Sequence, residues 1–231
     1  MSSVVVVGGT AGIGREIASS YARQGAEVWI TGRDPAGARE AAAEIGGDTR
    51  GVGCDLALPE SIAAAFSPIA RVDRLVLAAI ERDQNSVRAY EIQRALRLVT
   101  LKLVGYSEVV HQLADRFSPG AAMVLFGGVA KDRPYPGSTT VTAVNDGVDG
   151  LARSMAVELA PVRVNVIHPG IVGDSPAWVG KPDSVLGPLR ELTPIGRLVG
   201  MAEVVDSVEF LQENGGVNGV SLVVDGGWLL R

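Results

Sequence analysis

Short apolar runs alternate with longer amphipathic stretches along the whole chain. The runs are rich in Val, Ile and Leu, and several are apolar at every position rather than at alternate ones. Such continuity is typical of strands that are buried on both faces of a parallel sheet. Seven runs are predicted as strands: Val4–Val7, Glu27–Thr31, Thr49–Cys54, Leu75–Ala79, Met123–Phe126, Val162–Ile167 and Ser221–Val224.

The stretches between these runs have helical periodicity and contain good helix formers. Six helices are predicted: Gly14–Gln24, Ala36–Ile45, Ser61–Ala70, Asn85–Arg116, Val141–Leu159 and Ala202–Gln212. Strands that alternate with helices and connect by right-handed crossovers form a doubly wound sheet. We therefore expect an α/β fold of Rossmann type, with a doubly wound parallel sheet of seven strands and helices on both faces.

The length of 231 residues suits one domain, so we expect residues 1–231 to form a single dinucleotide-binding unit. Glycine and proline punctuate residues 171–200, which predicts a long loop with short helices. This segment follows a strand, and open α/β sheets bind ligands beyond the carboxyl ends of their strands. A lid over a substrate pocket is one interpretation of the segment, and an ordered crossover without a ligand role is the other.

Charge and cysteine content narrow the choice of partners. The net charge is −5 and the isoelectric point is near 5.1, so the chain lacks the basic surplus that nucleic acids require. We expect a small-molecule substrate.

The only cysteine, Cys54, excludes an intramolecular disulfide, fits a cytoplasmic location and is expected in the core. The apolar start Val4–Val7 is too short for a signal peptide or a membrane span, so no membrane partner is expected.

The turn after the first predicted strand is rich in glycine. It reads Gly8-Gly9-Thr10-Ala11-Gly12-Ile13-Gly14 and opens the first predicted helix. Glycines let the backbone approach a pyrophosphate, and the N-terminal N–H groups of a helix attract phosphate. The order of strand, turn and helix predicts a dinucleotide site. Its residues are Gly8, Thr10, Gly12, Ile13 and Gly14.

The end of the second predicted strand bears on cofactor choice. Folds specific for NAD usually place a carboxylate there for the ribose hydroxyls, but this chain has Gly32 followed by Arg33. A guanidinium suits a 2′-phosphate, so NADP(H) is favoured over NAD(H). Asp34 is an alternative ribose ligand, although Pro35 after it indicates the start of a helix instead.

Several motifs occur in an order that is found in one known family. They are the glycine turn, Cys54-Asp55-Leu56, Arg163-Val164-Asn165-Val166-Ile167-His168-Pro169-Gly170, Pro194-Ile195-Gly196-Arg197 and Val224-Asp225-Gly226-Gly227. With these motifs the chain resembles the short-chain dehydrogenases/reductases over nearly its whole length. The resemblance implies a homodimer or homotetramer. It also implies three groups of cofactor contacts: Asp55 and Leu56 at the adenine, Ala78 and Ala79 at the adenosine, and Pro169, Gly170 and Val172 along the nicotinamide.

The residues that carry the chemistry of that family differ here. The family uses a Tyr as general acid, a Lys four residues later, a Ser that orients the carbonyl and a helical Asn. Alignment of the motifs places Val141, Asn145 and Gly128 at the Tyr, Lys and Ser positions, and Lys102 or a neighbour at the Asn position. No Tyr in the chain is followed four residues later by Lys. The resemblance therefore implies a divergent member that lacks the Ser-Tyr-Lys residues.

Three residues are candidates for the roles of the absent catalytic residues. Lys102 either supplies the absent lysine charge from the long helix or is a solvated helix residue. Tyr135, in the loop after the fifth strand, either donates a proton or is a surface residue between two prolines. Asn145 can bind a ribose hydroxyl but has no charge with which to lower a neighbouring pKa. His168 and His111 are interpreted as strand-end and helix-face residues, and no metal site is expected.

Two function classes follow from these residues. The first is an NADP(H)-dependent oxidoreductase of the short-chain type with non-standard proton delivery, which reduces a small organic carbonyl, enone or imine. An imine-type substrate accepts hydride without forming an alkoxide, so the missing Tyr would be tolerable. The second is a non-redox NADP-binding protein that senses a ligand or catalyses a reaction without hydride transfer.

Overall fold

The computed structural model describes residues 1–231 and contains one seven-stranded sheet in the order β3-β2-β1-β4-β5-β6-β7. All neighbouring strands are parallel. The strands are β1 (Ser3–Val7), β2 (Glu27–Gly32), β3 (Asp48–Gly53), β4 (Val72–Leu77), β5 (Phe117–Phe126), β6 (Arg163–Pro169) and β7 (Ser221–Val224). Each predicted strand overlaps an observed one, and the predicted fold class is confirmed.

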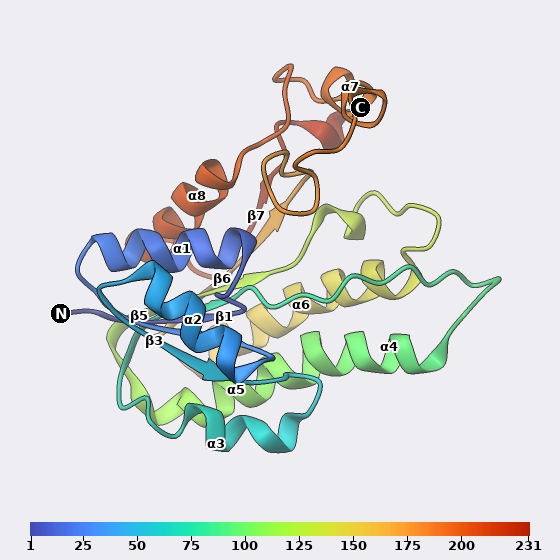
Figure 1. The fold of residues 1–231 in the computed structure, drawn as a ribbon. Coiled ribbons are helices and arrows are strands. Elements are labelled where there is room, and N and C mark those ends of the chain that lie inside the picture. Colours follow the sequence, from blue (N-terminus) through green and yellow to red (C-terminus); the bar gives the residue numbers. More distant parts are fainter.

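Helices cover both faces of the sheet (Figure 1). One face carries α1 (Gly12–Arg23), α2 (Pro35–Ile45) and α8 (Met201–Glu213), and the other carries α3 (Ile62–Phe66), α4 (Ile92–Val99), α5 (Tyr106–Leu113) and α6 (Thr139–Glu158). Strand β1 shows why its apolar run is continuous. Val4 and Val6 pack toward α1 and α8, whereas Val5 and Val7 pack toward α3 and α5.

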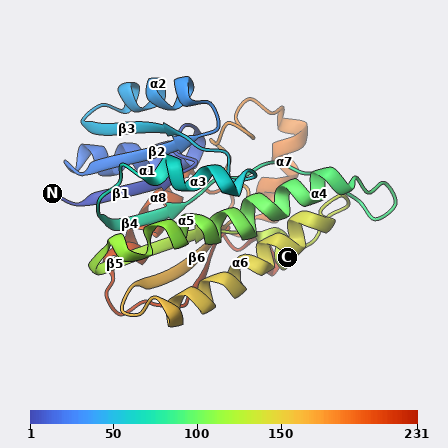
Figure 2. The same ribbon diagram turned by 90° about the horizontal axis from the view of Figure 1, so that it is seen from below.

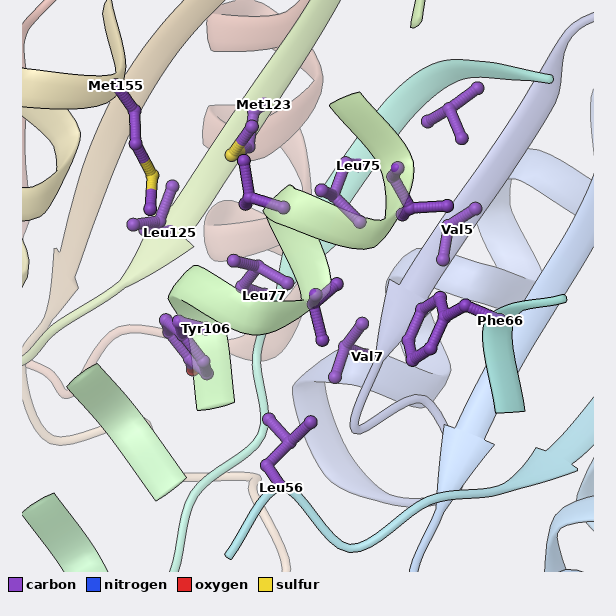
Figure 3. Packing of buried hydrophobic residues seen from close by; sticks show 14 of the residues in the cluster. Val5, Val7, Leu56, Phe66, Leu75, Leu77, Tyr106, Met123, Leu125 and Met155 are labelled. Atoms are coloured by element: carbon purple, nitrogen blue, oxygen red, sulfur yellow. The ribbon is translucent and has the colours of Figure 1, made fainter. Parts of the chain in front are cut away.

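The core under α3 and α5 is layered by strand register. Val5 pairs with Leu75, and Leu75 pairs with Met123, so that three neighbouring strands present apolar side chains at one level. Phe66 from α3 packs beside Val5, and Tyr106 from α5 lies beside Leu125, nearer the carboxyl ends of the strands (Figure 3). All of these side chains are fully buried. This layer fixes the strand ends from which the site is built.

The predicted helix Asn85–Arg116 is wrong over its first turns. Helix α4 begins only at Ile92. The reason is the buried side chain of Asn85, which forms hydrogen bonds with both the carbonyl and the N–H of Glu91. Its Nδ2 donates to the Glu91 carbonyl at 3.0 Å, and its Oδ1 accepts from the Glu91 N–H at 2.8 Å. Side-chain bonds of this kind compete with helix formation. Residues 85–91 therefore form a loop, with a tight turn in which the Ala89 N–H donates to the Ser86 carbonyl at 3.1 Å (Figure 2).

A wide helical turn joins α4 to α5. Residues Thr100–Gly105 (η2) form a π-helix, which changes the direction in which Lys102 projects relative to a regular helix. A Cβ atom at Gly105 would lie 2.5 Å from the carbonyl oxygen of Leu56. The glycine therefore lets this turn approach the loop after β3, and π-turns occur frequently at functional sites.

The predicted loop 171–200 contains α7 (Asp183–Leu192) and closes at its base. Val172 and Val199 form a parallel bridge, and the Gly173 N–H donates to the Val199 carbonyl at 2.9 Å. The segment projects beyond the carboxyl ends of β6 and β7 (Figure 1). No helix in the structure combines the length and apolarity needed to cross a membrane.

Candidate functional site

A cleft of about 1000 Å³ opens at the carboxyl edge of the sheet. It brings together every residue that the sequence nominated for cofactor binding or catalysis. These are Gly8, Thr10, Gly12, Ile13, Gly14, Arg33, Asp55, Leu56, Ala78, Ala79, Lys102, Tyr135, Asn145, Pro169, Gly170 and Val172. The residues come from segments spread over more than 160 positions, and the fold places them around one cleft.

The glycine turn lies at one end of the cleft and has no space for side chains. Gly8 has a φ of 86°, and a Cβ atom there would lie 2.7 Å from the Cα of Ala79. A Cβ atom at Gly14 would lie 2.2 Å from the Gly8 carbonyl oxygen. The N-cap residue of α1, Ala11, provides no side-chain acceptor, and the first turn of α1 contains no acidic residue. The helix N-terminus therefore leaves N–H groups for an anion such as a pyrophosphate.

Two neighbouring residues at the end of β2 have different roles. The Arg33 side chain is 70% exposed and lies 3.7 Å from the Glu81 carboxylate, so its guanidinium is open to a ligand. Asp34 caps α2, because its carboxylate accepts from the N–H groups of Ala36 and Gly37 at 3.2 and 2.9 Å. The interpretation of Asp34 as a helix start is confirmed, and that carboxylate is occupied by the helix.

An ion-pair network that the sequence did not suggest lies beside Arg33. Arg97 on α4 donates to Glu81 at 2.8 Å and to Asp55 at 3.0 Å. The hydrogen bond to Asp55, helped by the one to Glu81, raises the pKa of Arg97 against the opposing effect of burial. Glu81 is held more closely by Arg97 than by Arg33, at 2.8 against 3.7 Å, so the Arg33 guanidinium is only weakly paired.

Lys102 is buried in the wall of the cleft and is not the solvated helix residue of the alternative interpretation. Its Nζ donates to the Phe126 carbonyl at 2.6 Å and lies 3.0 Å from Oη of Tyr106. Tyr106 in turn donates to the Ala79 carbonyl at 2.8 Å. Burial lowers the pKa of Lys102 to about 7. The amine is therefore able to hold or release a proton near neutral pH.

Asn145 occupies the space beside the loop after β5. It is 6% exposed, and a Cβ atom at Gly128 would lie 2.9 Å from its Nδ2. The absent side chain at position 128 thus makes room for the Asn145 amide. Val141, one turn earlier on α6, lines the same cleft with an apolar side chain. These three residues form a surface with one neutral amide and no ionisable group.

A buried histidine fixes the backbone of that loop. His168, at the end of β6, accepts from the Gly128 N–H with Nδ1 at 2.9 Å, and its Nε2 lies 2.8 Å from Asp149. Because Nδ1 accepts, Nε2 carries the proton and donates to the carboxylate. Burial lowers the pKa of His168 more than Asp149 raises it, so the ring stays neutral. Gly127 is required here, since a Cβ atom would lie 2.4 Å from the ring.

The mouth of the cleft carries aromatic and cationic side chains. Tyr135 is 48% exposed; its backbone N–H donates to Oγ of Ser138 at 3.0 Å and its carbonyl accepts from the Ser138 N–H at 2.9 Å, whereas its hydroxyl has no partner. Arg133 stacks on the ring of Trp228 at 4.0 Å from the centroid. Ser175 lines the cleft, but its hydroxyl donates to the Val172 carbonyl at 2.7 Å.

The remaining reactive groups do not form a further centre. Cys54 is buried at the end of β3, and burial raises the pKa of its thiol to about 11. Its expected role as a core residue is confirmed. No three His, Cys, Asp or Glu side chains are placed so that they would hold a metal ion.

Comparisons with known proteins agree with this geometry. A family described as Enoyl-(Acyl carrier protein) reductase matches residues 8–229. The human protein named 3-oxoacyl-[acyl-carrier-protein] reductase is 33% identical over 96% of this chain and 95% of its own. Carbonyl reductase family member 4 of Xenopus tropicalis is 32% identical over 98% of this chain and 97% of its own.

Solved structures show the same fold. One described as a short chain dehydrogenase/reductase family protein superimposes with a TM-score of 0.87 and 30% sequence identity. It covers 100% of this chain and 98% of that protein. The family match, the relatives and this structure all extend over nearly the full length, so the chain belongs to the short-chain dehydrogenase/reductase family.

Proposed function

We propose that the protein is an NADP(H)-dependent oxidoreductase that reduces a small organic carbonyl, enone or imine without the tyrosine acid of its family. One observation carries the proposal. The cleft combines the glycine turn and an open Arg33 with Gly128, Val141 and Asn145, the residues that the motif alignment places where the family has its Ser, Tyr and Lys. The human and Xenopus relatives are named as reductases, which supports the reaction class.

The cofactor end of the cleft has the donors that NADP(H) requires. The uncapped N-terminus of α1 would hold the pyrophosphate, Arg33 the 2′-phosphate, and the Asn145 amide a ribose hydroxyl. When bound, the cofactor supplies hydride to the substrate. Leu56, Ala78 and the other apolar residues of the wall exclude water from its rings.

We assign proton delivery to Lys102. A general acid works best when its pKa is near the working pH, and burial brings Lys102 to about 7. The Phe126 carbonyl and the Tyr106 hydroxyl hold Nζ in place at 2.6 and 3.0 Å. Tyr106 is fully buried and acts on Lys102 rather than on a substrate. Tyr135 at the mouth is the second candidate donor because its hydroxyl is exposed and unpaired.

The test measures oxidation of NADPH with a panel of ketones, enones and imines. We expect Lys102→Met to lower turnover by about 10²–10⁴-fold while NADPH affinity stays within a few-fold. The exposed Lys181→Met serves as the control, and Tyr135→Phe, which removes the alternative donor, should leave turnover unchanged. If Lys102→Met keeps full turnover and Tyr135→Phe abolishes it, the proton comes from the mouth. NADPH binding without consumption by any substrate would favour the non-redox alternative.

We also propose a homodimer or homotetramer that forms through α4 and α6, which lie side by side (Figure 2). Ile92, Leu96 and Val157 project from these helices and are 63%, 54% and 79% exposed. Gly150 on α6 has open space at its Cβ position, which permits close approach of a second copy. Light scattering should give a multiple of the 24.0 kDa chain mass, and Leu96→Asp should shift it toward the monomer. A wild-type monomer at every concentration would contradict this proposal.

A further inference from the structure

The mouth of the cleft contains a cation that no carboxylate of the protein neutralises. Arg133 follows β5, and Trp228 begins the short helix η5 (Trp228–Leu230) after β7. The guanidinium carbon lies 4.0 Å from the indole centroid, and Nη1 donates to the Trp228 carbonyl at 2.9 Å. Both residues line the cleft together with Asn145 and Gly170. The stack and the hydrogen bond hold the guanidinium in one orientation before any ligand arrives.

Most of the donors on this guanidinium are unused. Arginine has five N–H donors, and only Nη1 of Arg133 has an acceptor in the protein. Two other cations near the cleft are paired instead. Lys131 pairs with Asp132 and Asp149 at 2.9 and 3.4 Å, and Arg97 pairs with two carboxylates on the cofactor side. Arg133 is thus an uncompensated, oriented donor at the substrate end of the cleft.

Trp228 adds a second donor without a partner. Its Nε1 is buried and has no acceptor in the structure. Five buried side-chain polar atoms lack a partner, and this is the one whose residue lines the cleft. A buried N–H without an acceptor is unfavourable, so a small shift that brings a ligand oxygen to it is favoured. The nearby Asp225 does not supply that oxygen, because it accepts from the N–H groups of Gly227 and Leu229 at 2.7 and 2.9 Å.

We infer that the substrate carries a carboxylate, which Arg133 binds at the mouth of the cleft beside Trp228 while the reducible carbon lies deeper. A carboxylate has the planar pair of oxygens that matches the free edge of a guanidinium. A cation without a carboxylate partner also attracts an anionic substrate at short range, within a chain whose net charge is −5. This inference rests on the proposed reductase function and makes it more specific: the substrate is an oxo, enoyl or imino acid rather than a neutral carbonyl compound.

The test compares acids with their methyl esters, which keep the reducible group and remove the charge. Pyruvate, acetoacetate and their methyl esters are each assayed for NADPH oxidation and for quenching of tryptophan fluorescence. The variants are Arg133→Met, which keeps much of the side-chain length, and Arg88→Met, an exposed control outside the cleft. We expect the wild type to prefer at least one acid by about 10-fold or more in kcat/KM and in affinity. Arg133→Met should remove that preference and leave the ester and NADPH values unchanged, whereas Arg88→Met should retain it.

The outcomes separate this inference from the proposed function. Turnover of acids and esters at equal rates, or no acid preference in any pair, overturns the carboxylate site and leaves the reductase in place. If Arg133→Met lowers kcat/KM equally for an acid and its ester, the carboxylate site is also overturned. Acid binding that depends on Arg133 without any NADPH oxidation supports the carboxylate site and overturns the reductase. Arg133→Lys, which keeps the charge and loses the paired donors, should retain part of the preference.

Discussion

The burial of Lys102 predicts a specific dependence of stability on pH. Its pKa is about 7 in the folded chain and 10.5 in the unfolded one, because the side chain is removed from water. Between these values the unfolded chain binds more protons than the folded chain, so the free energy of unfolding rises with pH. The rise from pH 7 to pH 9 amounts to about 2 kcal/mol from this one group. Below pH 7 both states are protonated and the contribution becomes flat.

The measurement is urea-induced unfolding at pH 7, 8 and 9, followed by tryptophan fluorescence, for the wild type and for Lys102→Met. The variant lacks the titrating amine, and every other group is common to both proteins. From pH 7 to pH 9 the unfolding free energy of the wild type should therefore rise by about 2 kcal/mol more than that of Lys102→Met, while the m-values stay unchanged. Parallel pH profiles for the two proteins would show that Nζ titrates normally, and the assignment of Lys102 as a proton donor at neutral pH would then be refuted.

Three further predictions concern the glycine turn, the core and the histidine. Gly14→Ala places a Cβ atom 2.2 Å from the Gly8 carbonyl oxygen, so NADPH affinity should fall at least 10-fold in a fluorescence titration. Tyr21→Phe leaves Oε1 of the buried Gln212 without its donor and should lower the unfolding free energy by about 1–3 kcal/mol in urea. The lowered pKa of His168 means that stability falls as pH drops below about 6.5, and His168→Gln should weaken that fall in thermal melts.

Local features of the sequence predicted the sheet and the glycine turn that follows its first strand. The continuous valines of β1 reflect burial on both faces of the sheet. The glycines of the turn stand at positions where a Cβ atom would overlap neighbouring atoms. Both depend on neighbours in the chain, and so periodicity and spacing reveal them. Asn85 has helix-compatible neighbours, and only its bonds to Glu91 and to the Gly137 carbonyl show why the helix starts later.

The chemistry at the substrate end depends on contacts between distant segments. Burial lowers the pKa of Lys102, and the segments that surround its amine are distant in sequence: the Phe126 carbonyl that it bonds is 24 residues away. The stack of Arg133 on Trp228 spans 95 residues. Neither partner has a sequence signal of its own, because an exposed and a buried cation look alike in the sequence. These roles could be assigned only after the fold had placed the segments together.

The central claim is that this cleft binds NADP(H) through Arg33 and the glycine turn. The most direct measurement is a titration of the purified protein with NADPH and with NADH, followed by nicotinamide fluorescence, for the wild type, Arg33→Ala and the exposed control Arg23→Ala. We predict that the wild type and Arg23→Ala bind NADPH about 10-fold more tightly than NADH, and that Arg33→Ala binds both alike. Failure of both cofactors to bind the wild type would contradict the account.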